Sequence, residues 1–231
     1  MIFNQFFDPV SSTFTYLISS GKGREALIID PVLEHTDDYI LFLKKLNLKL
    51  VKVIDTHIHA DHISGLKELK QQTDCAILMG EKSLSEVVNI KVKDNEKIKI
   101  DSIELTSMYT PGHTDCSYSF LMKDRIFTGD TLLINGTGRT DFQNGSPIDQ
   151  YHSLFDRILK LPEKIFVYPA HDYKGNKVST IGEQKRNNPR LKVKSADQYV
   201  KIMNSLNLEK PAMMDIAVPA NIKGKTLDQI K

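Results

Sequence analysis

The sequence predicts an α/β fold whose sheets contain both antiparallel and parallel pairs of strands. Short β-rich runs alternate with segments whose apolar residues recur at helical spacing. Several of these runs are close neighbours joined by turn residues, which predicts hairpins and therefore antiparallel pairs. In addition, side chains of unusual chemistry follow several predicted strands directly, as expected if the strands deliver them to one edge of a sheet.

The N-terminal part is predicted to open with a hairpin. Residues 14–19 and 25–29 are β-rich, and Gly21-Lys22-Gly23 between them can form a tight turn because glycine tolerates positive φ. Thr36 is the expected cap of a helix whose apolar positions, at helical spacing, are Tyr39, Ile40, Leu43 and Leu46.

The segment from Thr56 to His62 is predicted to lie on a loop between a strand and a helix. Residues 50–55 form a buried strand by pattern, and residues 63–72 carry helical periodicity. Such loops hold functional groups on rigid supports and leave them open to solvent.

The remaining elements are predicted from the same patterns. In chain order they are a strand at 76–79, a helical turn at 83–88, an exposed lysine-rich connection at 91–99, a strand at 103–109, a hairpin of 117–122 and 125–128 around Lys123-Asp124, a polar loop at 134–145, a helix starting at Ser146-Pro147, a strand at 164–168 and a final helix at 195–206. No internal repeat or low-complexity tract interrupts this order.

Charge and hydropathy exclude several classes of partner. The 31 Lys and Arg residues nearly balance 29 Asp and Glu, so a net charge of +2 gives no strong field for nucleic acid or anionic membrane. No apolar run approaches the length of a membrane span, and the N-terminus resembles neither a signal nor a transit peptide. We therefore expect a mature, soluble, cytoplasmic protein with a small-molecule partner.

The two cysteines, Cys75 and Cys116, are too few for a disulfide framework. Each is expected to be an ordinary buried thiol, which fits a reducing cytosol. Cys116 follows His113 by three residues, so a role as a sulfur acceptor is the alternative for that residue alone.

Seven metal-type side chains stand at or after predicted strand ends. They are His57, His59, Asp61, His62, His113, Asp130 and His171. Imidazole and carboxylate are ligands of transition metals, and this set takes five of the seven histidines of the chain. The alternative, that all are hydrogen-bonded loop residues, suits a single histidine better than such a cluster. His35 and His152 lie outside it and are expected to have no functional role.

The pattern resembles the metallo-β-lactamase superfamily. The matching motifs are His57-x-His59-x-Asp61-His62, Gly112-His113-Thr114, Gly129-Asp130-Thr131 and Ala170-His171-Asp172. The resemblance implies an αββα sandwich of two mixed sheets flanked by helices. It implies a single domain over residues 1–231, with a short C-terminal extension from about residue 178. Members usually hold two zinc ions in this pattern.

A narrower resemblance points to the persulfide dioxygenase branch. It is carried by Gly129 to Gly145, Tyr168 to Tyr173, Thr180 to Arg190 and Met213 to Asn221. That branch binds one Fe(II), which implies His57, His113 and Asp130 as its ligands here. Two imidazoles and one carboxylate form the facial triad of non-haem oxygenases, with positions left for O2 and substrate. The other four motif residues, His59, Asp61, His62 and His171, would orient the ligands.

The resemblance also implies the reaction. Glutathione persulfide would be oxidised with O2 and water to sulfite and glutathione. Arg139 and Tyr173 are the expected substrate-binding residues, since a guanidinium binds carboxylate in a fork. Arg186 and Arg190 could help in binding, but exposed salt bridges are the expected role of both. A homodimer is common in the family, and any sulfurtransferase partner would be a separate protein.

Two other functions remain compatible with the motifs. A glyoxalase II-like hydrolase would use two Zn ions, the second held by His59, Asp61, His62 and His171, to split glutathione thioesters. A non-catalytic sulfur-binding or relay protein would bind metal and persulfide without consuming O2. The loop from Leu132 to Gly145 and the short tail after His171 argue against the hydrolase, which usually carries a larger helical C-terminal domain.

Overall fold

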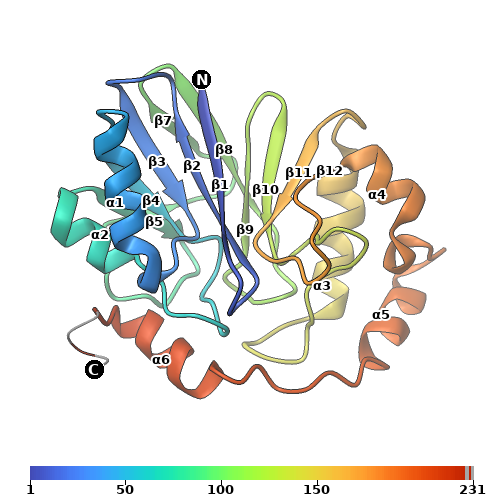
Figure 1. Ribbon diagram of the computed structural model, residues 1–231. Coiled ribbons are helices and arrows are strands. Elements are labelled where there is room, and N and C mark those ends of the chain that lie inside the picture. Colours follow the sequence, from blue (N-terminus) through green and yellow to red (C-terminus); the bar gives the residue numbers. More distant parts are fainter. Residues whose placement is uncertain (227–228, 230–231) are drawn as a thin grey trace.

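Two six-stranded mixed sheets face each other in the computed structural model, which describes residues 1–226 and 229 (Figure 1). The first sheet contains, in spatial order, β1 (Ile2–Asp8), β2 (Thr13–Ser19), β3 (Glu25–Ile29), β4 (Lys49–Ile54), β5 (Ala76–Gly80) and β6 (Ile90–Val92). The second contains β12 (Ser179–Thr180), β11 (Phe166–Pro169), β10 (Arg125–Gly129), β9 (Tyr118–Leu121), β8 (Ile103–Tyr109) and β7 (Lys97–Ile100). Each sheet combines antiparallel and parallel pairs, as predicted.

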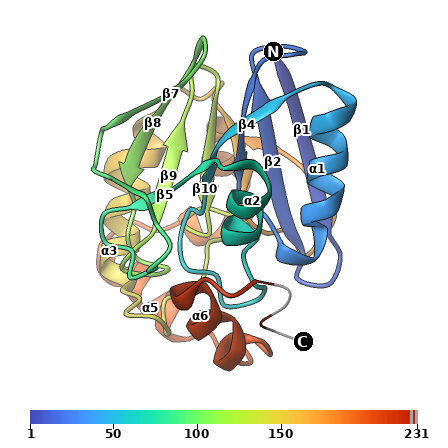
Figure 2. The same ribbon diagram turned by 90° about the vertical axis from the view of Figure 1, so that its left-hand side faces the viewer.

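Helices cover the outer face of each sheet, which completes the expected αββα order (Figure 1). The first sheet is covered by α1 (Thr36–Lys45) and α2 (Leu66–Thr73). The second is covered by α3 (Pro147–His152), which continues through the π turn Ser153–Arg157 and the 3-10 turn Ile158–Lys160, and by α4 (Ile181–Asn187), the 3-10 turn Pro189–Leu191 and α5 (Ala196–Asn204). The chain then passes beneath both sheets to α6 (Met214–Lys223), as Figure 2 shows from the side.

Alternating side chains bury both faces of each sheet. On β2 and β3, Tyr16 and Leu27 point between the sheets, whereas Leu17 and Ile28 point toward α1 and α2. All four are fully buried. Because successive side chains of a strand face opposite ways, one strand contributes to two core layers. These central strands therefore carry nearly continuous apolar runs, as strands covered on both faces do.

Most of the predicted elements are confirmed, with boundaries shifted by a few residues. The predicted helix at 63–72 begins only at Leu66, because residues 56–65 stay irregular around the histidine motif. Thr36 is the first helical residue and not the cap, since the 3-10 turn Leu33–His35 precedes it. Ser146 caps α3 as predicted, and its hydroxyl accepts a hydrogen bond from the Asp149 amide.

Two predictions for the middle of the chain are wrong. Residues 83–88 form turns without a helix, and the 91–99 connection contains parts of β6 and β7. Its lysines alternate with apolar residues along β7, where Ile98 and Ile100 face the core. The strand β1 and the helices α4 and α6 were not predicted.

None of the helices in the part of the chain that the structure describes has the length and apolar character needed to cross a bilayer.

The turn between β1 and β2 carries a charged pair that links it to α1. The Asp8 carboxylate accepts hydrogen bonds from the Ser11 amide and hydroxyl, and His35 Nε2 lies 3.2 Å from Asp8 Oδ1. Burial raises the pKa of Asp8, but the Ser11 bonds and His35 outweigh it and lower the pKa below 3.8. Burial likewise lowers the pKa of His35, but Asp8 and Asp38 outweigh it and raise the pKa above 6.5.

This pair predicts a pH-dependent contribution to stability. The His35 part is complete below pH 6.5 and is lost as the pH rises through the higher folded pKa, whereas the Asp8 part is present above pH 3.8 and is lost in acid. His35→Gln should therefore destabilise the fold by about 0.5 kcal/mol at pH 5.5, because the pair is partly exposed, and by nothing measurable at pH 9. Urea unfolding at the two pH values measures this difference. An equal loss at both would show that charge is not involved.

Candidate metal centre

Four strands end at the same edge of the two sheets and deliver the predicted residues there. His57 follows β4, His113 follows β8, Asp130 follows β10 and His171 follows β11. Potential ligand atoms of His57, His113 and Asp130 lie within 4.8 Å of one another, and those of His59, Asp61, His62 and His171 form a second such group. The fold thus brings together all seven residues that the sequence singled out, but in two adjoining sets.

His57 is buried and held in one orientation by Thr56. Its Nδ1 lies 3.0 Å from the Thr56 hydroxyl oxygen, and that hydroxyl lies 3.1 Å from a carboxylate oxygen of Asp30. Because the hydroxyl donates to Asp30, it accepts from His57 Nδ1, which leaves Nε2 with its lone pair available for a metal. Burial and the neighbouring histidines lower the pKa of His57 well below 6.5, so the neutral ligand form is favoured.

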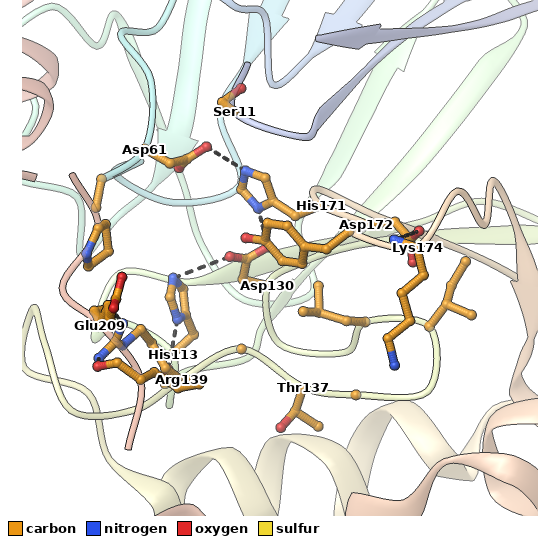
Figure 3. Close-up of a pocket in the computed structure, with 18 of the residues that line it drawn as sticks. Ser11, Asp61, His113, Asp130, Thr137, Arg139, His171, Asp172, Lys174 and Glu209 are labelled. Atoms are coloured by element: carbon orange, nitrogen blue, oxygen red, sulfur yellow. Dashed lines mark hydrogen bonds and ion pairs between the residues drawn. The ribbon is translucent and has the colours of Figure 1, made fainter. Parts of the chain in front are cut away.

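His113 is oriented by the backbone of the 134–145 loop. Its Nδ1 donates to the Arg139 carbonyl oxygen at 2.8 Å, which again leaves Nε2 available (Figure 3). The loop can approach this closely because residue 138 is a glycine. A Cβ at this position would collide with the Asp130 carbonyl oxygen and lie 2.9 Å from His113 Nδ1. The glycine-punctuated loop therefore shapes the site through its backbone.

His171 joins the two groups by bridging two carboxylates. Its Nδ1 lies 2.6 Å from Asp130 Oδ1, and its Nε2 lies 2.7 Å from Asp61 Oδ2 (Figure 3). Burial lowers the pKa of His171, but the charges of Asp130 and Asp61 raise it well above 6.5. Burial raises the pKa of Asp130, but His171 outweighs it and holds the pKa far below the usual range. Both ring nitrogens of His171 therefore donate, one to each carboxylate, which requires the protonated form of the ring.

His59 and His62 are held less completely. His59 Nε2 lies 3.2 Å from Asp30 Oδ1, while His59 Nδ1 and His62 Nε2 are buried without a hydrogen-bond partner among the described residues. Orphaned buried polar atoms are costly, and nitrogens of this kind suit an ion. The Thr13 hydroxyl, which was not predicted to belong to the site, lies within 3.2 Å of Asp61, His62 and His171.

A cavity of about 660 Å³ opens onto the two groups. Asp61, His113, Asp130 and His171 form part of its lining, together with the 133–139 loop and residues from the segment between α5 and α6 (Figure 3). Such a concave site with convergent polar groups is the usual form of a small-molecule site.

The two predicted substrate-binding residues both line this cavity. The Arg139 guanidinium binds Asp141 in a fork at 2.7 Å and donates to the carbonyl oxygens of Leu208 and Glu209. The Tyr173 ring stacks on His171 with centroids 6.2 Å apart and remains largely exposed. In this structure, Arg139 therefore pins the segment between α5 and α6 against the cavity.

Three further lining residues were missed or misjudged from the sequence. The prediction of an exposed salt bridge is wrong for Arg190, which lines the cavity and donates to the Thr137 carbonyl and hydroxyl oxygens, with no acidic partner among the described residues. Arg186 does pair with Glu163 at the surface. Lys174, directly after Tyr173, and Met213 also line the cavity. A lone sequence contains no signal that these residues meet.

Asn221 of α6 holds the loop of residues 57–64 in place by side-chain hydrogen bonds. Its side-chain amide donates to the carbonyl oxygens of His59 and His62 and accepts from the Ser64 amide, at 2.8 to 3.0 Å. The side chain is buried. The helix that was not predicted therefore closes the loop that carries four of the candidate ligands.

Asn221→Ala should destabilise the protein and loosen the metal site together. It leaves two carbonyl oxygens and one amide of a buried loop unsatisfied, which costs about 2 to 4 kcal/mol in total. Thermal unfolding and the metal dissociation constant measure both effects. Asn204→Ala, at an exposed position of α5, is the matched control. If the two variants had the same stability and metal affinity, the Asn221 contacts would contribute to neither.

The residues expected to lie outside the site do so. Both cysteines are buried and unpaired, as expected for ordinary thiols. His152 pairs with Asp156 on the surface, and His35 pairs with Asp8 and Asp38.

Most of this chain is similar in sequence to proteins of a known family. The model of the Metallo-beta-lactamase superfamily matches residues 8–171. The human protein named persulfide dioxygenase ETHE1, mitochondrial, is 42% identical over 226 residues, which cover 96% of this chain and 88% of that protein. A hydroxyacylglutathione hydrolase from Dictyostelium discoideum is 31% identical over 168 residues, 69% of this chain and 62% of that protein.

A solved structure with the same name as the human relative, ETHE1, has a closely similar fold. The crystal structure of ETHE1 from Myxococcus xanthus superposes with a TM-score of 0.94 at 44% identity, covering 96% of this chain and 98% of that one. The likeness extends over α4, α5 and α6 as well as the sandwich, because nearly the whole of both chains is matched.

Proposed function

Because this chain belongs to the metallo-beta-lactamase superfamily and, within it, to the persulfide dioxygenases, we propose that it oxidises glutathione persulfide at a single Fe(II) ion held by His57, His113 and Asp130. The reaction consumes O2 and water and yields sulfite and glutathione. The observation that carries the proposal of one ion is the position of His171 between Asp130 and Asp61.

The donor set fits Fe(II). Two neutral imidazoles and a carboxylate form a facial triad, and the two Nδ1 atoms are already engaged by Thr56 and by the Arg139 backbone. His171 has both ring nitrogens directed at carboxylates, so it acts as a clamp that orients Asp130 and is not available as a ligand. This supports one filled site and a second group that orients it.

The chain's own residues contribute positioning and charge complementarity. When bound, Fe(II) would supply the redox chemistry that zinc lacks. Asp130 and Asp61 stay ionised through His171, and burial lowers the pKa of His57 and so favours its neutral ligand form. The cavity wall, which the 133–139 loop and the segment between α5 and α6 contribute to, would hold the thiol carrier in one orientation.

We propose that Arg139 and Tyr173 bind the glutathione moiety, with Arg190 as a third contact. All three line the same cavity, and a guanidinium group binds a carboxylate in a fork, as Arg139 does here with Asp141. Arg139→Ala should raise KM for glutathione persulfide about tenfold with metal content unchanged, since the His113 contact uses the Arg139 backbone. Arg186→Ala, which removes an exposed charge outside the cavity, is the control. A fall in kcat alone would contradict a binding role.

One experiment decides between the functions. The protein is purified anaerobically, iron and zinc are counted per chain, and O2 uptake with glutathione persulfide is followed in parallel with hydrolysis of a glutathione thioester. One iron with O2 uptake is the expected result. Binding of metal and persulfide without O2 uptake would instead indicate a sulfur-binding protein.

A glyoxalase II-like hydrolase is the second candidate, because His59 Nδ1 and His62 Nε2 lack partners. These nitrogens, with Asp61 and His171, could hold a second ion of a two-zinc site. The partial similarity to a hydroxyacylglutathione hydrolase agrees with it. Two metals per chain with thioester hydrolysis would establish this candidate.

We also propose that the chain acts as a single domain with an extension from about residue 178, as a homodimer in the cytoplasm, and receives persulfide from a separate sulfurtransferase. The unpaired buried cysteines agree with a reducing compartment. Analytical ultracentrifugation tests the dimer, with a monomer as the contradicting result.

A further inference from the structure

A chain of hydrogen bonds leads from the cavity to the surface along the β1–β2 turn. Ser11 lines the cavity, and its hydroxyl lies 2.5 Å from Asp8 Oδ2. The other oxygen of this carboxylate lies 3.2 Å from His35 Nε2, and His35 Nδ1 lies 3.3 Å from Asp38. Asp8 is buried, whereas the His35 side chain is 33% exposed and that of Asp38 is 71% exposed. The path therefore begins in the cavity and ends in solvent.

At its inner end the path contacts the metal centre through two hydroxyl groups. The Ser11 hydroxyl lies 2.6 Å from the Thr13 hydroxyl, which lies 3.0 Å from His171 Nε2. Ser11 lies on the Asp61 side of His171 in the cavity wall (Figure 3). None of these contacts is needed to hold a metal ion, and the backbone bonds from the Val10 and Ser11 amides to Asp8 are enough to form the turn.

The proposed reaction releases protons in the cavity. Neutral glutathione persulfide, O2 and one water give glutathione, the sulfite dianion and two protons, so that atoms and charge balance. A thiol carrier bound in the cavity would cover its open side, which leaves the wall as the route for these protons. Resting on the proposed function, we propose that Ser11, Asp8 and His35 form the path by which these protons reach solvent.

Each member of the path can move one proton without any oxidant or reductant. The Ser11 hydroxyl accepts a proton from cavity water and donates its own to Asp8. Rotation of the carboxyl group passes the proton to Nε2 of neutral His35, which releases the Nδ1 proton toward Asp38 and water. Turning the ring then exposes Nε2 to water, where it loses this proton while Nδ1 takes one from water, which restores the starting tautomer. The net result is one proton moved from cavity to solvent.

The charges around the path suit this task. His35 has Asp8 on one side and Asp38 on the other, and the buried hydroxyl of Tyr39 lies against the same turn through Thr15. Asp61, His62 and His171 face the inner end across Thr13. Burial lowers the pKa of His35, but the two carboxylates outweigh it and raise the pKa above its usual value.

The test measures steady-state O2 uptake by the iron-loaded enzyme with saturating glutathione persulfide at low buffer concentration. Ser11→Ala and His35→Gln should each lower kcat about tenfold, with KM and iron content unchanged. Imidazole added as a diffusible proton carrier should restore kcat in these variants, with wild type in the same series correcting for inhibition. Ser11→Thr keeps the hydroxyl and should retain activity. His152→Gln, at an exposed pair outside the site, is the control.

The outcomes separate this path from the proposed function. Unchanged kcat in both variants, or a loss that imidazole does not restore, would overturn the path while leaving the dioxygenase in place. A wild-type enzyme that takes up no O2 with persulfide would overturn the proposed function, and the path with it.

Discussion

His113→Ala is expected to remove the bound metal and abolish O2 uptake together. His113 supplies one of three ligands, and a site with only His57 and Asp130 would hold Fe(II) weakly. We expect metal affinity to fall by about a hundredfold or more, because substitution of residues that only orient the ligands already lowers metal affinity about 10- to 100-fold. Metal analysis after dialysis and an oxygen electrode measure the two losses, and His57→Ala and Asp130→Ala should behave alike.

Variants in the second group provide the matched comparison. If one ion is bound, His62→Ala should retain close to one iron per chain, because His62 belongs to the other set of ligand atoms. If two ions are bound, the same variant should lose one of them. His152→Ala controls for removal of a histidine outside the site. Full iron and full activity in His113→Ala would show that the assigned triad is wrong.

Gly138→Ala is expected to disable the metal centre while leaving most of the fold intact. The added methyl group would collide with the Asp130 carbonyl oxygen and come within 2.9 Å of His113 Nδ1. The loop must then move, which breaks the hydrogen bond from the Gly138 amide to Asp130 and displaces the Arg139 carbonyl from His113. We expect stability to fall by about 1 to 3 kcal/mol through overpacking. Metal affinity should fall at least tenfold.

Gly136→Ala is the control for this prediction. A Cβ at position 136 would lie 3.9 Å from the Leu133 side chain, an ordinary contact in the same loop. The two variants are compared by denaturant unfolding and by metal titration. Equal metal affinity in both would mean that the close approach of the loop does not shape the site.

The ligand cluster could be predicted from the sequence because its chemistry is local to strand ends. His57, His113, Asp130 and His171 each follow a short apolar run, and neighbouring strands in a layered sheet bring such residues to one edge. The division into two groups could not be predicted. It depends on the directions of side chains that are distant in the sequence. His171, for example, lies between Asp130, 41 positions earlier, and Asp61, 110 positions earlier.

The residues that hold the ligand cluster in place could not be predicted from the sequence, for a different reason. Thr13, Asn221 and Arg190 are residue types that occur on any surface or helix, and only the tertiary fold gives them partners in the site. The strand β7 was missed because its lysines mask the alternating Ile98 and Ile100. Its place beside β8 is set by pairing across the hairpin, which overrides local composition.

The contacts of Asn221 also constrain when the site can be completed during synthesis. Asn221 bonds carbonyl groups 159 and 162 positions earlier in the chain. The loop that carries His57 to His62 therefore leaves the ribosome long before the helix that fastens it. Until α6 docks, the nascent chain presents metal-binding side chains in an unfinished geometry. The metal centre therefore reaches its final geometry only after α6 has been synthesised and has docked.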